Sequence, residues 1–252
     1  RLSTGKRINS ASDDAAGLAI ETRMTSQIRG LQQAARNAND GIAMLQTADG
    51  AAAEMTNMFQ RMRELAVQSQ TGTLGTEDIA NLNQEFAALA TEIDRIADDT
   101  TFNNIAILAS TQTINIAVGA DEADVIALSM LDFNLAAGAS GTPMKADLTN
   151  FKTEGTADDV NTSGVIVHID DAIKGIASAR ATFGATIYRL EYTVDNLNST
   201  VLNTQAAKSQ IVDADYAAET TELARTQIIS QASTAMLSQA NQQAQSVLAL
   251  LK

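Results

Sequence analysis

The chain has 252 residues and is rich in small and aliphatic side chains: 45% of its residues are hydrophobic, 45 are alanine and only 4% are aromatic. Its 17 basic and 30 acidic residues give a formal net charge of −13 at pH 7, which disfavours binding to nucleic acid or to anionic membranes. The absence of cysteine excludes disulfides, thiolate metal sites and cysteine nucleophiles.

The N-terminal residues carry no recognisable targeting signal. The sequence begins at Arg1 with neither an initiator methionine nor a basic and then apolar signal peptide. No apolar run approaches the ~20 residues that cross a bilayer. We therefore expect that the numbering starts inside a longer parent protein.

A first long helix is predicted from a heptad-like apolar stripe. Its expected start is Ser12-Asp13-Asp14, because a capping residue followed by carboxylates suits the positive end of a helix. Its expected end is near Gly72. Three internal glycines suggest close approach of another element. The stripe consists of Ile28, Leu31, Ala35, Ala38, Ile42, Leu45, Ala48, Ala52, Met55, Phe59, Met62 and Ala66.

A second, shorter helix follows, with Thr76 as its expected cap and an acidic first turn. The short link from Gln70 to Gly75 is expected to fold it back antiparallel on the first helix. Its stripe consists of Ile79, Leu82, Phe86, Leu89, Ile93 and Ile96.

The middle of the chain has a different periodicity. Alternating apolar residues predict a strand over 113–118, with further strands over 125–130 and 132–135 and turn-like sequence over 138–143. Helical periodicity returns afterwards, and a last amphipathic segment follows Asp213-Ala214-Asp215. The helical stripe before that segment consists of Ile173, Ile176, Phe183, Ile187, Leu190, Val194, Leu197 and Val201.

These patterns predict a mainly α fold, in which a long coiled-coil-like bundle from both chain ends carries a small β-containing middle insert. The expected division is an N-terminal helical region over 1–104, a middle region over 105–163, a bundle helix over 164–212 and a C-terminal amphipathic helix over 213–252. A lone amphipathic helix is marginally stable, so the end segments must pair with each other or with another molecule.

Long blocks at both ends of the chain form a family pattern. On the N-terminal side they are RLSTGKRINSASDDAAGLAI (1–20), GLQQAARNANDGIAMLQTADGA (30–51), RMRELAVQSQTGT (61–73) and EIDRIADDTTFN (92–103). On the C-terminal side they are RATFGATIYRLEYTVDNLNST (180–200) and DADYAAETTELARTQIISQASTAMLSQAN (213–241). These blocks resemble bacterial flagellin. The sequence departs from the family pattern at Tyr188, where asparagine is common, at Ala244, where proline is common, and after Asn103.

The resemblance implies a secreted, extracellular structural subunit that assembles into the bacterial flagellar filament and serves motility, without enzyme activity or cofactor. It implies as partners other subunits, an export chaperone and the filament cap. The family starts with a further helical segment, so the chain resembles a flagellin that lacks its N-terminal segment.

The resemblance also implies candidate contact residues. In family members detected by the innate immune flagellin receptor, the matching contact positions are Arg61, Leu65 and Glu85; Arg61, Glu64 and Leu65 are equally candidates for contact with a neighbouring subunit. The C-terminal segment resembles the helix of the inner filament core. Its apolar stripe, which lacks a mate in this chain, is expected to fray or to dock on a neighbour: Ile229, Met236, Ala240, Val247 and Leu251.

Two alternatives depend on the middle region. One alternative is a flagellin-like surface protein that uses this insert to bind an extracellular polysaccharide, although few aromatic side chains are present there to stack on sugars. The acidic residues Asp121, Glu122 and Asp124 are a weaker candidate for a calcium site. His168, the single histidine, has no serine triad or ligand cluster beside it and is expected to be structural or partly exposed.

Overall fold

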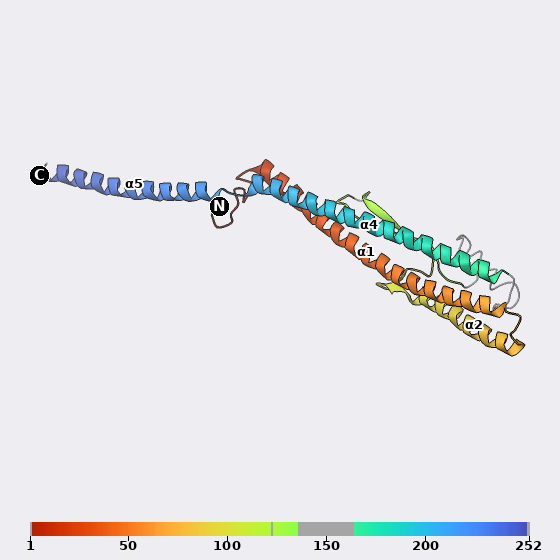
Figure 1. Ribbon diagram of the computed structural model, residues 1–252. Helices are drawn as coiled ribbons and strands as arrows, with labels where there is room; N and C mark the ends of the chain where they lie inside the picture. The colour runs from red at the N-terminus through yellow and green to blue at the C-terminus, as the bar shows by residue number, and fades with distance from the viewer. Residues whose placement is uncertain (1, 122, 136–163, 251–252) are drawn as a thin grey trace. The chain divides into compact units, whose positions relative to one another are not determined.

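The computed structural model describes residues 2–121, 123–135 and 164–250, with side chains described as far as residue 240 (Figure 1). Its helices are α1 (Ala15–Ser69), α2 (Thr76–Asp99), α4 (Val165–Val212) and α5 (Tyr216–Leu250). Two antiparallel pairs of strands complete the fold: β1 (Thr101–Phe102) with β2 (Ile105–Ala106), and β3 (Gln112–Ala117) with β4 (Val125–Met130). The prediction of a mainly α fold with a small β-containing middle is confirmed.

The chain forms two compact units. One consists of residues 1–29 and 200–252, and the other of residues 30–199. The second unit is continuous in sequence, whereas the first combines residues from both ends of the chain. Among the described residues, no helix has the length and apolar character needed to cross a bilayer.

Carboxylates organise the starts of α1 and α2. Asp14 directly precedes α1, and its Oδ1 accepts a hydrogen bond from the backbone N–H of Gly17 at 2.9 Å, as expected for a cap. The predicted cap of α2 is off by one residue: Gly75 is the N-cap and Thr76 is the first helical residue. A glycine suffices at this cap because Asp78 accepts the Gly75 N–H at 3.0 Å.

The β3–β4 hairpin matches two of the three predicted strands. Six residue pairs join it, from Gln112 with Met130 to Ala117 with Val125. The predicted strand at 132–135 is wrong, because this segment continues past the end of the ladder. It is held instead by single bonds such as the one from the Phe133 N–H to the Leu108 carbonyl. The predicted turn at 138–143 lies outside the described residues.

The core of the unit formed by residues 30–199 lies between α1, α2 and α4, which run side by side (Figure 1). The predicted stripes of these helices are buried or partly buried. The β3–β4 hairpin packs one face against this core. In β4, Ile126, Leu128 and Met130 are buried while the residues between them are exposed, and β3 alternates in the same way between partly buried and exposed residues.

Small residues let these elements approach closely. A Cβ atom on Gly41 would lie 3.3 Å from Ile116 Cγ1 and 3.4 Å from Leu190 Cδ1, so the glycine marks the place where β3 and α4 meet α1. The expected explanation by close approach does not hold for Gly50, which has nothing within 4 Å of such a Cβ. Buried alanines extend the seam: Ala38, Ala48, Ala52, Ala66, Ala97, Ala172 and Ala179.

Ion pairs between α1 and α4 flank this seam. Arg63 Nε lies 2.6 Å from Asp170 Oδ1, and Arg180 Nε lies 2.7 Å from Asp49 Oδ1. The hydrogen bond from Arg63 holds the pKa of the Asp170 carboxyl below its usual range. All four side chains are well exposed, so the pairs favour one register of the helices and add little stability.

We predict that enlarging the alanine seam destabilises the protein. Replacing the fully buried Ala48 by leucine should lower the free energy of unfolding by about 1–3 kcal/mol, because a close-packed core cannot accept extra methylenes without strain. Ala43→Leu on the exposed side of the same helix should change it by less than about 0.5 kcal/mol. Urea unfolding followed by circular dichroism measures both, and equal effects would contradict close packing at Ala48.

Candidate functional site

The described residues hold no group of three or more histidine, aspartate or glutamate side chains suited to a metal ion. His168 lies in the first turn of α4, where its backbone N–H bonds to the Gly164 carbonyl. In the turn between β3 and β4, the backbone N–H of Asp124 donates to the carbonyl of Asp121. Glu122 lies outside the described residues. The described residues form three distinct surfaces, one near the N-terminus, one on α1 and α2, and one along α5.

The first is a clasp between residues 5–8 and the end of α4, within the unit formed by residues 1–29 and 200–252. The Arg7 N–H donates to the Val212 carbonyl at 2.7 Å, and the Ala214 N–H donates to the Gly5 carbonyl at 3.0 Å. Between these bonds, Lys6 and Asp213 form an antiparallel β-bridge. These bonds pair a strand-like N-terminal segment with the short link between α4 and α5.

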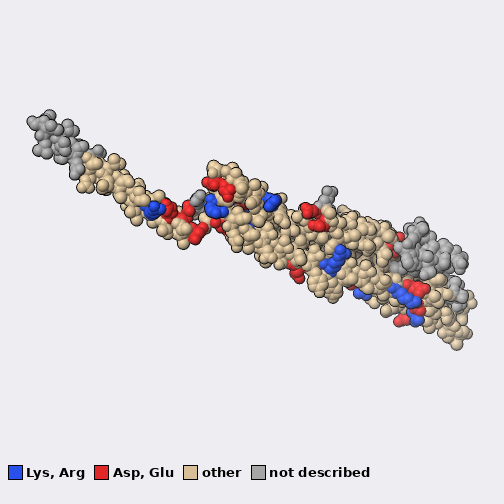
Figure 2. Space-filling model, turned by 90° about the horizontal axis from the view of Figure 1, so that it is seen from above, with Lys and Arg blue, Asp and Glu red and all other residues tan. Residues whose placement is uncertain are grey.

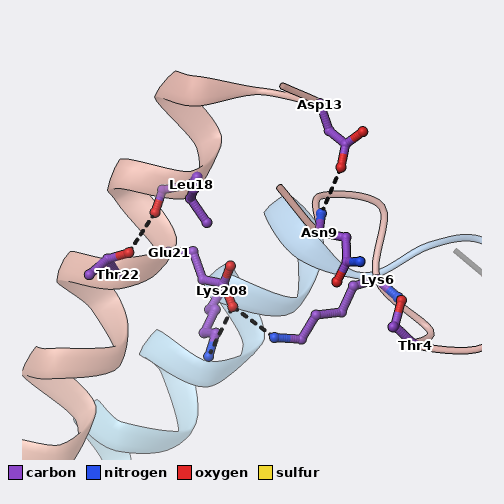
Figure 3. A network of polar contacts seen from close by, with 8 residues as sticks. All are labelled: Thr4, Lys6, Asn9, Asp13, Leu18, Glu21, Thr22 and Lys208. Atoms are coloured by element: carbon purple, nitrogen blue, oxygen red, sulfur yellow. Dashed lines mark hydrogen bonds and ion pairs between the residues drawn. The ribbon is translucent and has the colours of Figure 1, made fainter. Parts of the chain in front are cut away.

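A buried carboxylate reinforces the clasp (Figure 3). Glu21 of α1 has a side chain only 13% exposed, and its Oε1 lies 2.9 Å from Lys6 Nζ and 3.8 Å from Lys208 Nζ. One negative charge thus holds two ammonium groups, one from the N-terminal segment and one from α4. A partly desolvated pair of this kind is stronger than an exposed ion pair.

Apolar packing completes the clasp. Ile8 is buried, and a Cβ on Gly17 would lie 2.4 Å from Ile8 Cδ1, so a side chain at position 17 would displace the isoleucine. Asp13 closes the loop between them by accepting the backbone N–H groups of Asn9 and Ser10. The loop before α1 is therefore ordered by its own carboxylates and by one glycine.

The second surface contains the predicted contact residues of α1 and α2, which the structure brings together. Arg61 Nε donates to Glu85 Oε1 at 2.8 Å, and Arg61 Nη1 donates to Glu64 Oε2 at 2.9 Å. These hydrogen bonds, chiefly the one to Glu85, raise the pKa of the Arg61 guanidinium. The cluster is exposed and presents the edge of one guanidinium between two carboxylates.

Leu65 differs from the other predicted contact residues because its side chain is 0% exposed. It belongs to the hydrophobic core of the protein. The motif alone gave no sign of this burial. A partner that touched Leu65 directly would have to open the core.

The third surface is the helix α5. It begins directly after Asp215, whose Oδ1 accepts the N–H of Ala217 at 2.9 Å as a cap. Ile229, Met236 and Ala240 of the predicted filament-core stripe are exposed, as are all residues from 221 to 240. The side chain of Val247 and the whole of Leu251 lie outside the described residues.

Sequence reasoning missed the clasp entirely. The bond from the Arg7 guanidinium to the Ile211 carbonyl joins residues 204 positions apart, and neither segment shows a strand pattern. The exposed cluster was found only by resemblance, because an arginine near two glutamates on a helix is also typical of an ordinary solvated face.

Comparison with known proteins assigns both ends of the chain. Residues 1–113 match the model of the bacterial flagellin N-terminal helical region, and residues 166–251 match that of the bacterial flagellin C-terminal helical region. A flagellin of Halalkalibacterium halodurans is 46% identical over the whole chain, which covers 90% of that protein. The flagellar filament 33 kDa core protein of Treponema phagedenis is 41% identical, with the same coverage of both.

A solved structure agrees with these relatives. The crystal structure of Bacillus cereus flagellin matches 69% of this chain and 94% of its own, with 31% identity and a TM-score of 0.51. Because the matched proteins are by name flagellins or a flagellar filament core protein, a surface protein that binds polysaccharide through its middle region is the less favoured interpretation.

We predict that Glu21→Gln loosens the clasp, because it leaves Lys6 and Lys208 facing each other without a neutralising charge. The expected loss of about 0.5–1.5 kcal/mol should speed amide hydrogen exchange at Arg7 and Ala214 roughly twofold to tenfold. Glu222→Gln is the control, because Glu222 pairs with Arg225 one turn away on α5 and takes no part in the described bonds of the clasp. Unchanged exchange at both amides in Glu21→Gln would show that the backbone bonds hold the clasp without the carboxylate.

Proposed function

Since the chain belongs to the bacterial flagellin family and is a structural subunit of the flagellar filament, we propose that it joins the filament by burying one side of α5 against helices of neighbouring subunits. The observation that carries this proposal is the exposure of large apolar side chains along α5. Ile229 and Met236 are 51% and 68% exposed and stand one heptad apart. Leu223 and Leu237, two heptads apart, are also exposed.

This spacing is typical of a coiled-coil seam, in which residues seven apart lie on the same side of a helix. A helix with an uncovered apolar side is only marginally stable in water. Burial of each large aliphatic side chain contributes about 1.5–3 kcal/mol. A polymer that covers the seam therefore stabilises α5 and holds the subunit at the same time.

The distribution of charge supports the same assignment. Residues 30–199 contain nine basic and 23 acidic side chains, a net charge of −14, whereas residues 1–29 and 200–252 contain eight and seven, a net charge of +1. The unit formed by residues 1–29 and 200–252, the terminal unit, can thus pack densely against copies of itself without net repulsion. On the face drawn in Figure 2, charged side chains lie in small groups separated by broad uncharged areas.

Residues 30–199 form the acidic central unit of each subunit. For assembly, salt must screen the repulsion between the central units of neighbouring subunits. The Debye length falls from about 8 Å at physiological ionic strength to about 3 Å at 1 M salt. We therefore infer that high salt favours polymerisation.

By the same resemblance we infer that the subunit is exported to the outside of the cell. An export chaperone and a filament cap are then its partners on the way. A structural role without catalysis agrees with the exposed helical surfaces described above.

We predict that polar substitutions in the α5 seam prevent assembly. Ile229→Gln combined with Met236→Gln should raise the critical concentration for polymerisation in high salt at least about tenfold, since each lost contact is worth about 1.5 kcal/mol or more. The control is Gln231→Ala with Ser238→Ala, which has the same spacing on the opposite side of the helix. Sedimentation and negative-stain electron microscopy detect the polymer, and equal assembly of both variants would contradict a buried seam.

We further propose a second role for the cluster of Arg61, Glu64 and Glu85, namely recognition by an innate immune flagellin receptor. The mutual contacts of these three exposed side chains support it, because they form one preformed charged surface on α1 and α2. The competing interpretation is contact with a neighbouring subunit, and the two make different predictions.

For receptor recognition, Arg61→Ala should reduce the response of receptor-reporter cells at least about tenfold while the subunit still polymerises. Arg95→Ala is the matched control, because Arg95 is an exposed arginine of α2 that likewise bridges two carboxylates, Glu92 and Asp99. It should leave the response unchanged. Loss of polymerisation with an unchanged receptor response would assign the cluster to the subunit contact instead.

A further inference from the structure

An open groove runs along α4 in the unit formed by residues 30–199. Its volume is about 630 Å³. It lies beside the end of β3, and its lining combines aromatic, apolar and polar side chains, among them Val118, Tyr188, Arg189, Tyr192, Asn196 and Leu197. None of the contact surfaces described above includes these residues.

The two tyrosines of the groove are unusual for this chain. Aromatic side chains are scarce, and four of the six phenylalanines are almost completely buried: Phe59, Phe86, Phe133 and Phe183. Tyr188 and Tyr192, in contrast, are 64% and 74% exposed. They stand four residues apart and so project from the same side of the helix. Two neighbouring exposed rings make an amphipathic contact surface of the kind enriched at protein interfaces.

Arg189 adds a cation that is uncommitted within the described part of the chain. The other described arginines and the described lysine of residues 30–199 bond to a carboxylate or, for Arg36, to the amide of Gln33. No described side chain neutralises the guanidinium of Arg189. This cation belongs to a unit whose net charge is −14, so any second copy of the chain offers a surplus of carboxylates to it.

We propose that this groove receives a second copy of the chain in the polymer, with Tyr188 and Tyr192 buried against the neighbour and Arg189 paired with one of its carboxylates. The inference rests on the proposed assembly of the subunit and adds a lateral contact to the one made by α5. The complementarity is electrostatic as well as apolar, because the guanidinium of Arg189, which has no carboxylate partner among the described residues, lies beside two rings and meets an acidic partner surface.

The shape of the groove favours a protein occupant over a small ligand. It is open along the helix, whereas small-molecule sites enclose most of their ligand. A filament subunit must cover large surfaces with copies of itself, and exposed aromatic residues near an arginine are typical anchors of such interfaces.

The three tyrosines of the chain provide a direct test. Tyr188, Tyr192 and Tyr216 are all exposed in the subunit, so tetranitromethane should nitrate all three in dilute protein, as measured by peptide mass spectrometry. In the polymer, nitration of Tyr188 and Tyr192 should fall at least about tenfold. Nitration of both at the rate of the dilute subunit would overturn the proposal, and so would protection that is already present in unassembled protein from cells, since another occupant would then fill the groove.

Variants separate the groove from the folding of the subunit. Tyr188→Gln with Tyr192→Gln, and separately Arg189→Glu, should raise the critical concentration for polymerisation at least about fivefold with an unchanged melting temperature. Arg189→Lys should retain assembly. The control is Val167→Gln, which alters an exposed apolar residue of α4 outside the groove.

Experiments on the unmodified subunit and on the variants distinguish failure of assembly from failure of the groove contact alone. If the unmodified subunit forms no polymer in high salt, assembly fails and the groove contact falls with it. If the polymer forms while the tyrosine and Arg189→Glu variants assemble like the unmodified subunit, only the groove contact is refuted.

Discussion

Close packing of α1 against α2 and α4 through small side chains is the constraint on which the central unit depends. Alanines at the contact and the glycine at position 41 let helices and β3 approach within van der Waals distance. A core built in this way needs few aromatic rings, and the chain contains few. The rings that remain exposed are then available for contacts outside the subunit.

The net charge is distributed unequally between the two units. The central unit carries all of the net negative charge, and its described cations are largely paired with carboxylates of the same unit. The terminal unit is nearly neutral and displays uncovered apolar side chains on α5. Repulsion between central units and attraction between terminal helices therefore oppose each other, and ionic strength shifts the balance between them.

The elements that repeat along one helix were predictable from the sequence. The apolar stripe from Ala38 to Ala66 predicts the buried side of α1, and the alternation of apolar and polar residues predicts the β3–β4 hairpin, because periodicity reports local geometry directly. The unpaired segment at 132–135 was not predictable, since alternation alone does not say whether a partner strand is present.

Contacts between distant parts of the chain were also not predictable from the sequence. The clasp joins Arg7 to Val212 through backbone groups, which carry no residue-type signal. Glu21 resembles any glutamate of a helix until two lysines from separate segments are seen beside it. Likewise, Leu65 belongs to the family motif of a contact surface, yet its burial follows from packing against neighbouring helices and not from the motif.

In the proposed filament, α5 is uncovered in the free subunit and becomes buried in the polymer. Amide hydrogen exchange over residues 216–240 should therefore be compared between the dilute subunit and the polymer. We expect fast exchange in the dilute subunit and strong protection in the polymer. Equal protection in both states would contradict it, because α5 would then be stabilised by something other than neighbouring subunits.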